Sequence, residues 1–236
     1  MSDMFTIIWK EWKDSLFQGG LRAWIRPALL IGIVGVAWPL AGKTAWLGLS
    51  PIQMVVVLWV AFFVILSIVA DSFAGERERH TLETLLASRI SDRSILMGKV
   101  AIVVLYGWGV MVVGLFVGAA VCSLAYGQGH VLFYPVDMLV LTLVMGLLVG
   151  TFGATAGVLL SLRMSTVRQV QQALTIGTVL LGGALIGLLQ LLPKGLFQAF
   201  TTDQVLLMVA GVVALVDIVL LALTLLRFQR TKLIVR

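Results

Sequence analysis

The stretch from Ile52 to Ala70 reads IQMVVVLWVAFFVILSIVA and contains no charged residue. An α-helix rises about 1.5 Å per residue, so a run of about 20 apolar residues crosses a hydrocarbon core of about 30 Å. The stretch lacks the alternation of apolar and polar residues that is typical of a strand in a membrane barrel. It therefore predicts a transmembrane helix.

Five further runs of this kind are bounded by charged residues, Gly, Pro or polar clusters. The chain is 60% hydrophobic and only 12% charged, whereas about a quarter of the residues in soluble proteins are charged. Because the surplus of apolar side chains must face lipid, we expect an all-α membrane protein with six transmembrane helices in a single domain, 1–236. The spans are expected at about 25–41, 52–70, 100–126, 136–162, 173–192 and 205–226.

The distribution of Lys and Arg predicts the orientation of these helices, because cytoplasmic loops retain positive charge. Fifteen of the 17 Lys and Arg residues fall on one side of the expected bundle, and only Lys43 and Lys194 fall on the other. The side with fifteen includes both termini. We therefore expect a multi-pass protein of the cytoplasmic (plasma) membrane with both termini in the cytoplasm. Since the basic residues flank apolar spans, the pI near 9.9 does not indicate nucleic-acid binding.

The first 22 residues predict a helix that lies in the plane of the membrane interface. Apolar residues recur there at helical spacings, with charged residues mostly on the opposite side. The alternative is an ordinary flank that orients the first span. The apolar positions are Phe5, Ile8, Trp9, Trp12 and Leu16.

The segment 71–99 holds ten charged residues between two apolar runs, so we expect it to lie in water or against another protein. Within it, Leu82, Leu85, Leu86 and Ile90 fall on one side of a short amphipathic helix. A helix this short is marginal in water, so its leucine side needs a surface on which to dock. Gly75 can break the preceding helix. Ser91 and Asp92 can cap the next one, which runs into the third span.

Asp217 lies near the middle of the last expected span, where an acidic side chain costs about 2.5 to 3.5 kcal/mol on insertion scales. One interpretation is that the carboxyl group is protonated or hydrogen-bonded to a polar neighbour such as Thr142, Thr151 or Gln171. The other is that Asp217 takes part in the substrate path or in gating.

Glycine pairs four residues apart favour close packing between helices, with a lined pathway or a dimer seam as the alternative. They are Gly114 and Gly118, Gly146 and Gly150, Gly153 and Gly157, and Gly183 and Gly187.

Motifs for covalent chemistry are not convincing in this sequence. Residues 37–44 read AWPLAGKT, which satisfies a permissive nucleotide-binding pattern, but Trp38, Pro39 and Leu40 end an apolar span instead of forming a glycine-rich loop after a strand. His80 and His130 have no partner at metal-ligand spacing. We therefore expect no catalytic residue and no metal site in this chain.

The segment 71–99 resembles the signature cytoplasmic loop of the ABC type-2 exporter permeases. The number of spans, the N-terminal helix and the position of the loop between spans two and three also resemble that family. The residues that carry the resemblance are Gly75-Glu76-Arg77-Glu78, Thr81-Leu82-Glu83 with Leu85-Leu86, Ile90-Ser91, Ile95-Leu96 and Gly98-Lys99.

The resemblance implies a membrane-spanning permease subunit of an ATP-driven ABC exporter. Two permease subunits, identical or paired, would form the pathway, and two separate ATPase subunits would bind ATP and Mg²⁺; this chain itself would bind no cofactor. The helix at about 76–86 would be the coupling helix, with Glu76 and Arg77 at polar contacts and Leu82, Leu85 and Leu86 as the apolar plug. The alternatives are an ATP-independent secondary transporter or channel, and a membrane scaffold or assembly subunit. The apolar spans do not identify the substrate.

Overall fold

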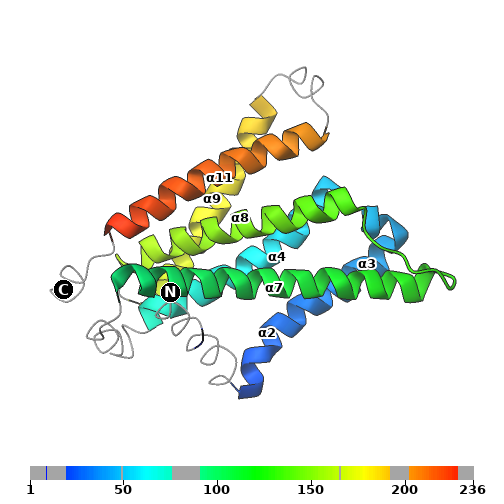
Figure 1. The fold of residues 1–236 in the computed structure, drawn as a ribbon, viewed down its shortest axis with the longest axis horizontal. Coiled ribbons are helices and arrows are strands. Elements are labelled where there is room, and N and C mark those ends of the chain that lie inside the picture. Colours follow the sequence, from blue (N-terminus) through cyan, green and yellow to red (C-terminus); the bar gives the residue numbers. More distant parts are fainter. Residues whose placement is uncertain are drawn as a thin grey trace. The chain divides into compact units, whose positions relative to one another are not determined.

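The computed structural model describes Trp9 and residues 20–48, 50–75, 91–164, 166–191 and 202–227, and every regular element in these ranges is a helix (Figure 1). The first helical run is α2 (Gly20–Gly32), the π-helix η1 (Ile33–Ala37), α3 (Trp38–Gly42) and the 3₁₀ turn η2 (Lys43–Gly48). It is followed by α4 (Pro51–Ala70), the π-helix η3 (Asp71–Gly75), α7 (Asp92–Tyr126), α8 (Val136–Ser161), α9 (Val167–Leu191) and α11 (Thr202–Arg227).

The predicted membrane character of these helices is confirmed. Five described segments are long and apolar enough to cross a bilayer: Pro27–Gly48, Gln53–Ala70, Arg93–Tyr126, Val136–Ser161 and Gln204–Leu226. The expected fifth span, 173–192, overlaps α9, which is not among these five. The side chains of 181–191 lie outside the described part, so the count of six spans stays a prediction. The in-plane helix at 1–22 also lies outside the described residues, apart from the exposed Trp9 and the start of α2.

The chain divides into two compact units, and the expected single domain stays a prediction. The first unit combines 1–65 with 90–154, and the second combines 66–89 with 155–236. The first therefore contains the run from α2 to η2, most of α4, all of α7 and most of α8. The second contains the end of α4, η3, the end of α8, α9 and α11.

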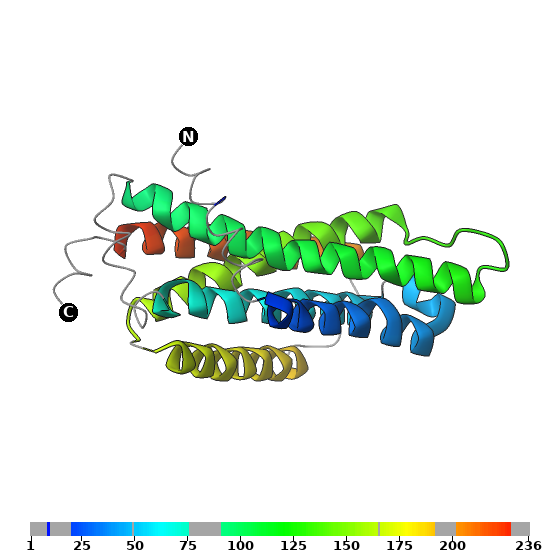
Figure 2. The same ribbon diagram turned by 90° about the horizontal axis from the view of Figure 1, so that it is seen from below.

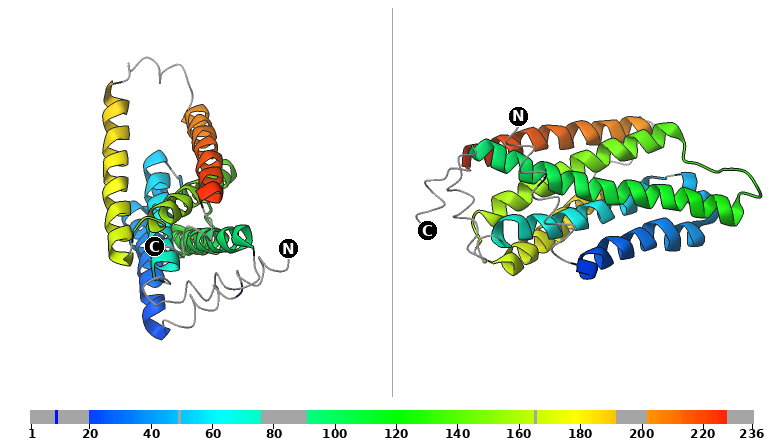
Figure 3. Two further views of the ribbon diagram at one scale, coloured as in Figure 1. Left: turned by 90° about the vertical axis from the view of Figure 1, so that its left-hand side faces the viewer. Right: turned by 60° about the horizontal axis from the view of Figure 1, so that its bottom comes forward.

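In the first unit, the run α2, η1 and α3 packs along α7 (Figures 2 and 3). The run and α7 point in the same direction, so η2 and the loop 127–135 meet at the end of the unit where both finish. Hydrogen bonds join the two there: the Tyr126 hydroxyl donates to the Leu40 carbonyl oxygen (3.0 Å), and the Cys122 thiol donates to the Lys43 carbonyl oxygen (3.5 Å). The first and third expected spans therefore run in the same direction.

Glycines provide the close approaches between these helices, as predicted from their spacing. A Cβ atom on Gly35 would lie 2.9 Å from Val117 and 3.0 Å from the Gly114 carbonyl oxygen, so the first helical run and α7 are in backbone contact there. Gly146 of α8 leaves the space that the Met111 side chain of α7 fills. Close packing is therefore the role of the described glycine pairs, while the side chains around 183 and 187 lie outside the described part.

In the second unit, two contacts surround the segment that leads into the charged loop. The helix α9 contacts η3, and Gly157 near the end of α8 lies against Val69 in the last turn of α4. A Cβ atom on Gly157 would overlap the Val69 side chain. The end of α4 is therefore held by close packing directly before the loop begins.

Candidate functional site

The predicted coupling segment begins where the described part of the second unit stops. Gly75 is buried and is the last residue of η3. The remaining predicted coupling residues lie outside the described residues, so their roles stay predictions. They are Glu76, Arg77, Glu78, Thr81, Leu82, Glu83, Leu85 and Leu86.

The entrance to this segment is a π-helix, which the sequence did not reveal. The five residues Asp71–Gly75 continue α4 with a wider turn, and α9 packs on them. Short π-helical insertions within helices are frequent at functional sites. No break separates α4 from η3 along the chain, so the helix of the second span continues as far as Gly75.

The exit from the segment is a capped helix start, as predicted. Ser91 has an extended backbone, and its hydroxyl oxygen accepts a hydrogen bond from the main-chain N–H of Ser94 (3.2 Å). The cap satisfies one of the main-chain donors that a helix start leaves unpaired. The capped helix α7 therefore begins at Asp92, directly after Ser91.

The expectation that all charged residues of 71–99 lie in water or against another protein is wrong for Lys99. Its side chain is 1% exposed, inside the first unit, whereas Arg93 is exposed. Lys99 lies two turns into α7 and has an interaction partner within the protein. The long aliphatic stem of lysine suits an apolar surrounding, so the Gly98-Lys99 pair belongs to the packed part of α7.

Asp217 is the second candidate site, in the second unit. Its side chain is 5% exposed, and neither carboxyl oxygen has a hydrogen-bond partner among the described residues. The hydroxyls of Thr142 and Thr151, two of the partners considered for it, donate to main-chain carbonyl oxygens of their own helix. The interpretation that a polar neighbour satisfies Asp217 therefore has no support in the described part of the chain.

A polar and aromatic cluster, which the sequence analysis missed, joins the turn at 43–50, the loop 127–135 and α7. We define the loop-end cluster as Pro39, Trp46, Gly118 and Tyr134. A Cβ atom on Gly118 would lie 2.8 Å from the Tyr134 hydroxyl oxygen and 3.4 Å from Nε1 of Trp46. The Trp46 indole N–H is buried without a hydrogen-bond partner in the described part. The sequence feature that could have indicated this cluster is the position of Trp46 and Tyr134 close to glycine-containing turns.

The ionisation of Tyr134 reflects its position in this cluster. Its side chain is 3% exposed, and burial raises the pKa of Tyr134 to about 12. The nearby Trp46 indole opposes this rise, while Cys122 adds to it. The phenol therefore stays protonated and available as a hydrogen-bond donor across the physiological pH range.

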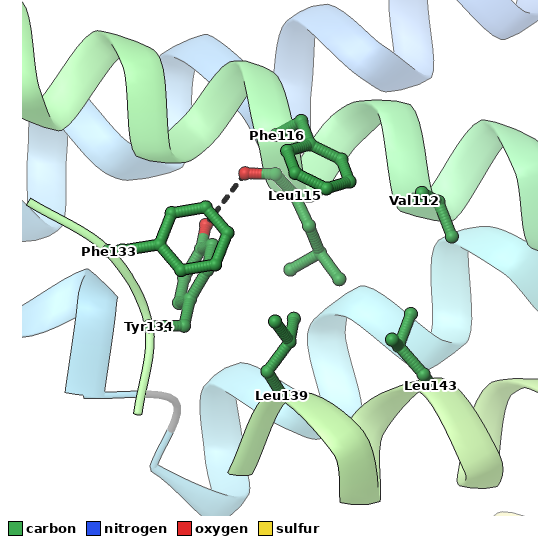
Figure 4. A pocket seen from close by; sticks show the side chains of 7 residues that line it. All are labelled: Val112, Leu115, Phe116, Phe133, Tyr134, Leu139 and Leu143. Atoms are coloured by element: carbon green, nitrogen blue, oxygen red, sulfur yellow. Dashed lines mark hydrogen bonds between the residues drawn. The ribbon is translucent and has the colours of Figure 1, made fainter. Parts of the chain in front are cut away.

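An apolar groove beside Tyr134 lacks the available polar groups of a ligand site. Figure 4 shows it between α7, the loop 127–135 and α8. Tyr134 is its one lining residue with a polar side chain, and that hydroxyl is already used in a hydrogen bond. A site that orients a ligand needs a few available polar groups among its apolar walls. The lining residues are Val112, Leu115, Phe116, Phe133, Tyr134, Leu139 and Leu143.

Comparison with known protein families identifies a match that includes the helices on both sides of the charged segment. Residues 47–202, more than half of the 236 residues, match the family described as ABC-2 family transporter protein. The matched range contains the whole segment 71–99 and ends before Asp217. No curated protein is similar enough in sequence to count as a relative.

Proposed function

Because the chain belongs to the ABC-2 transporter family, we propose that it is the permease subunit of an ATP-driven exporter in the cytoplasmic membrane. The observation that carries the proposal is the family match across 47–202, which includes the charged loop between α4 and α7. Permeases of ABC transporters work with ABC ATPases. We propose two separate ATPase subunits and a second permease copy or a paired permease as partners of this chain.

The coupling step uses the loop 76–90. The leucine stripe at Leu82, Leu85 and Leu86 docks into a cleft on the ATPase, while the surrounding charges orient it. Two features of the described chain support this proposal. The π-helix η3 continues α4 up to Gly75, and the Ser91 cap starts α7 directly after the loop. Movement of the docked helix would therefore act on spans two and three together.

The double variant Leu85→Asp with Leu86→Asp tests this proposal, because it places two carboxylates in the apolar stripe. We expect loss of copurification with the ATPase and loss of ATP-driven transport, while the permease still inserts in the membrane. The matched control is Thr84→Asp with Ser88→Asp, which adds the same two charges on the opposite side of the helical wheel.

The expected result for the control is normal copurification. If the Leu85 and Leu86 variant also copurified with the ATPase and transported normally, the coupling assignment would be wrong. Transport by the purified permease without any ATPase would instead support the ATP-independent transporter. An ATPase complex without transport of any substrate would support the scaffold.

A further inference from the structure

The buried carboxyl group of Asp217 also bears on the class of molecule that the permease carries, an inference that rests on the proposed function. We propose that Asp217 is the counter-charge for a positively charged group on an otherwise apolar substrate. Asp217 lies outside the range matched by the family, so the proposal depends on this chain's own residues.

Three buried hydroxyl side chains show why Asp217 differs. The hydroxyls of Thr142, Ser161 and Thr224 donate to main-chain carbonyl oxygens three or four residues earlier, at 2.6 to 2.7 Å. An ionised carboxylate has no proton to donate, so it cannot be satisfied by the carbonyl groups of its own helix. Asp217 needs a donor from elsewhere, and the described chain supplies none.

The position of Asp217 excludes water and lipid headgroups as easy donors. It lies nine residues from one end of the span Gln204–Leu226 and 13 from the other, or about 14 and 20 Å along the helix. Headgroups and bulk water are therefore remote from it. A donor carried by the substrate would reach the carboxyl group inside the apolar layer of the membrane.

The surroundings of Asp217 on α11 suit an apolar molecule with one charge. Helical side chains lean toward the N-terminus, so the carboxyl group lies over the turn that contains Ala214, with Ala210 one turn further. Both residues have small side chains and are half-buried. The exposed side chains of the helix near it are apolar: Leu207, Met208, Val209, Val212, Leu215, Val216, Ile218, Val219 and Leu223.

A cation is the partner that this group prefers. A buried carboxylate is costly unless a positive charge accompanies it, and a charged hydrogen bond is stronger than a neutral one. An anionic substrate would be repelled, and an uncharged one would leave the carboxylate without a counter-charge. The expected substrates are therefore amphipathic cations, such as apolar molecules with an ammonium or phosphonium group.

The test uses tetraphenylphosphonium and tetraphenylborate, two ions of similar size and shape but opposite charge. Saturable binding is measured on the purified full-length permease in lipid nanodiscs, without the ATPase. We expect the wild type to bind the cation in preference to the anion. Asp217→Asn should lower the cation affinity at least about tenfold, equivalent to about 1.4 kcal/mol. Asp217→Glu should retain most of the affinity, and the control Asp137→Asn, at an exposed acid, should bind normally.

Equal binding of both ions by the wild type, or unchanged cation binding by Asp217→Asn, would overturn the proposal. If the Asn variant did not fold, the wild-type protein would be tested instead. Labelling of its Asp217 by an apolar carbodiimide would be compared with and without each ion. Protection by the cation and not by the anion supports the proposal. Labelling that neither ion affects would show a carboxyl group that binds only a proton, and would overturn it. ATPase copurification is measured separately, so failure of the cation site leaves the permease assignment standing.

Discussion

The Tyr134 hydroxyl donates a hydrogen bond to the main-chain carbonyl oxygen of Leu115 over 3.2 Å. Tyr134 belongs to the loop between α7 and α8, and Leu115 lies in the middle of the C-terminal half of α7 (Figure 4). The bond therefore ties the loop to the helix more than two turns before that helix ends. Because it requires a protonated phenol, it has a defined dependence on pH.

We predict that the stabilisation from this tie is complete up to about pH 10 and declines between about pH 10 and 12. Burial raises the folded-state pKa of Tyr134 to about 12, above the ordinary value near 10. The folded state then holds the proton more tightly, so the stabilisation is complete below the unfolded pKa and declines as pH rises through the folded one. Ultraviolet titration of phenolate absorbance checks this, with Tyr134→Phe as the reference that removes one of three tyrosines. Identical titration curves for the two proteins below pH 11 agree with the prediction, whereas a Tyr134 signal near pH 10 contradicts it.

We predict that Gly118→Ala destabilises the permease by about 1 to 3 kcal/mol, the usual cost of overpacking. The new methyl group would lie 2.8 Å from the Tyr134 hydroxyl oxygen and 3.3 Å from Cγ of Pro39, so the loop-end cluster must shift. The matched control is Gly109→Ala in the same helix, where nothing lies within 4 Å of the added atom. Thermal unfolding in detergent compares the two, and equal melting temperatures would show that the cluster yields without cost.

We predict that Ser91→Ala frays the start of α7, because the N–H of Ser94 loses its acceptor. Loss of an N-cap costs about 0.5 to 2 kcal/mol, and in a helix of 35 residues the effect stays in the first turns. Hydrogen exchange should therefore rise at residues 92–95 but not in the middle of α7. Ser91→Asn, which restores a capping side chain, should return the exchange to normal. Faster exchange in both variants would mean that the cap is not the cause.

We predict that Gly157→Ala lowers both stability and the amount of transport per ATP hydrolysed. The added methyl group overlaps Val69 at the end of α4, so the helix end before η3 must move. The control is Gly177→Ala in α9, which has open space around the added atom. Transport and ATP hydrolysis measured together in proteoliposomes separate the effects. A Gly157→Ala protein with normal coupling would show that the packing of α4 is not part of the transmission.

The sequence was a good guide to the helices, because transfer of side chains into lipid is a local property of a run of residues. The expected spans 52–70 and 136–162 agree with α4 and α8 to within one residue. The cap at Ser91 was also predicted, since it depends on residues three apart. These features share one cause: the residues that decide them are neighbours in the chain.

Features that depend on distant residues could not be predicted. The bond from Tyr134 to Leu115 joins positions 19 residues apart, and the burial of Lys99 depends on how neighbouring helices pack. From the hydropathy of lysine alone, the Lys99 side chain would be expected in water. For Asp217 the sequence indicated an unusual residue, but the absence of a partner appeared only with the positions of the side chains. Composition therefore predicts that a polar group is costly, and three-dimensional packing shows whether the cost is offset.

The length of α7 has a mechanical consequence. At 35 residues it is about 52 Å long, well over the roughly 30 Å thickness of the hydrocarbon core. The first turn of this unbroken helix follows the charged loop, and its far third carries Gly118 beside Tyr134. Pivoting by about 10 degrees around its first turn would swing the other tip by about 9 Å. Under the proposed coupling, a small push on the loop would thus become a large displacement at the far end of α7.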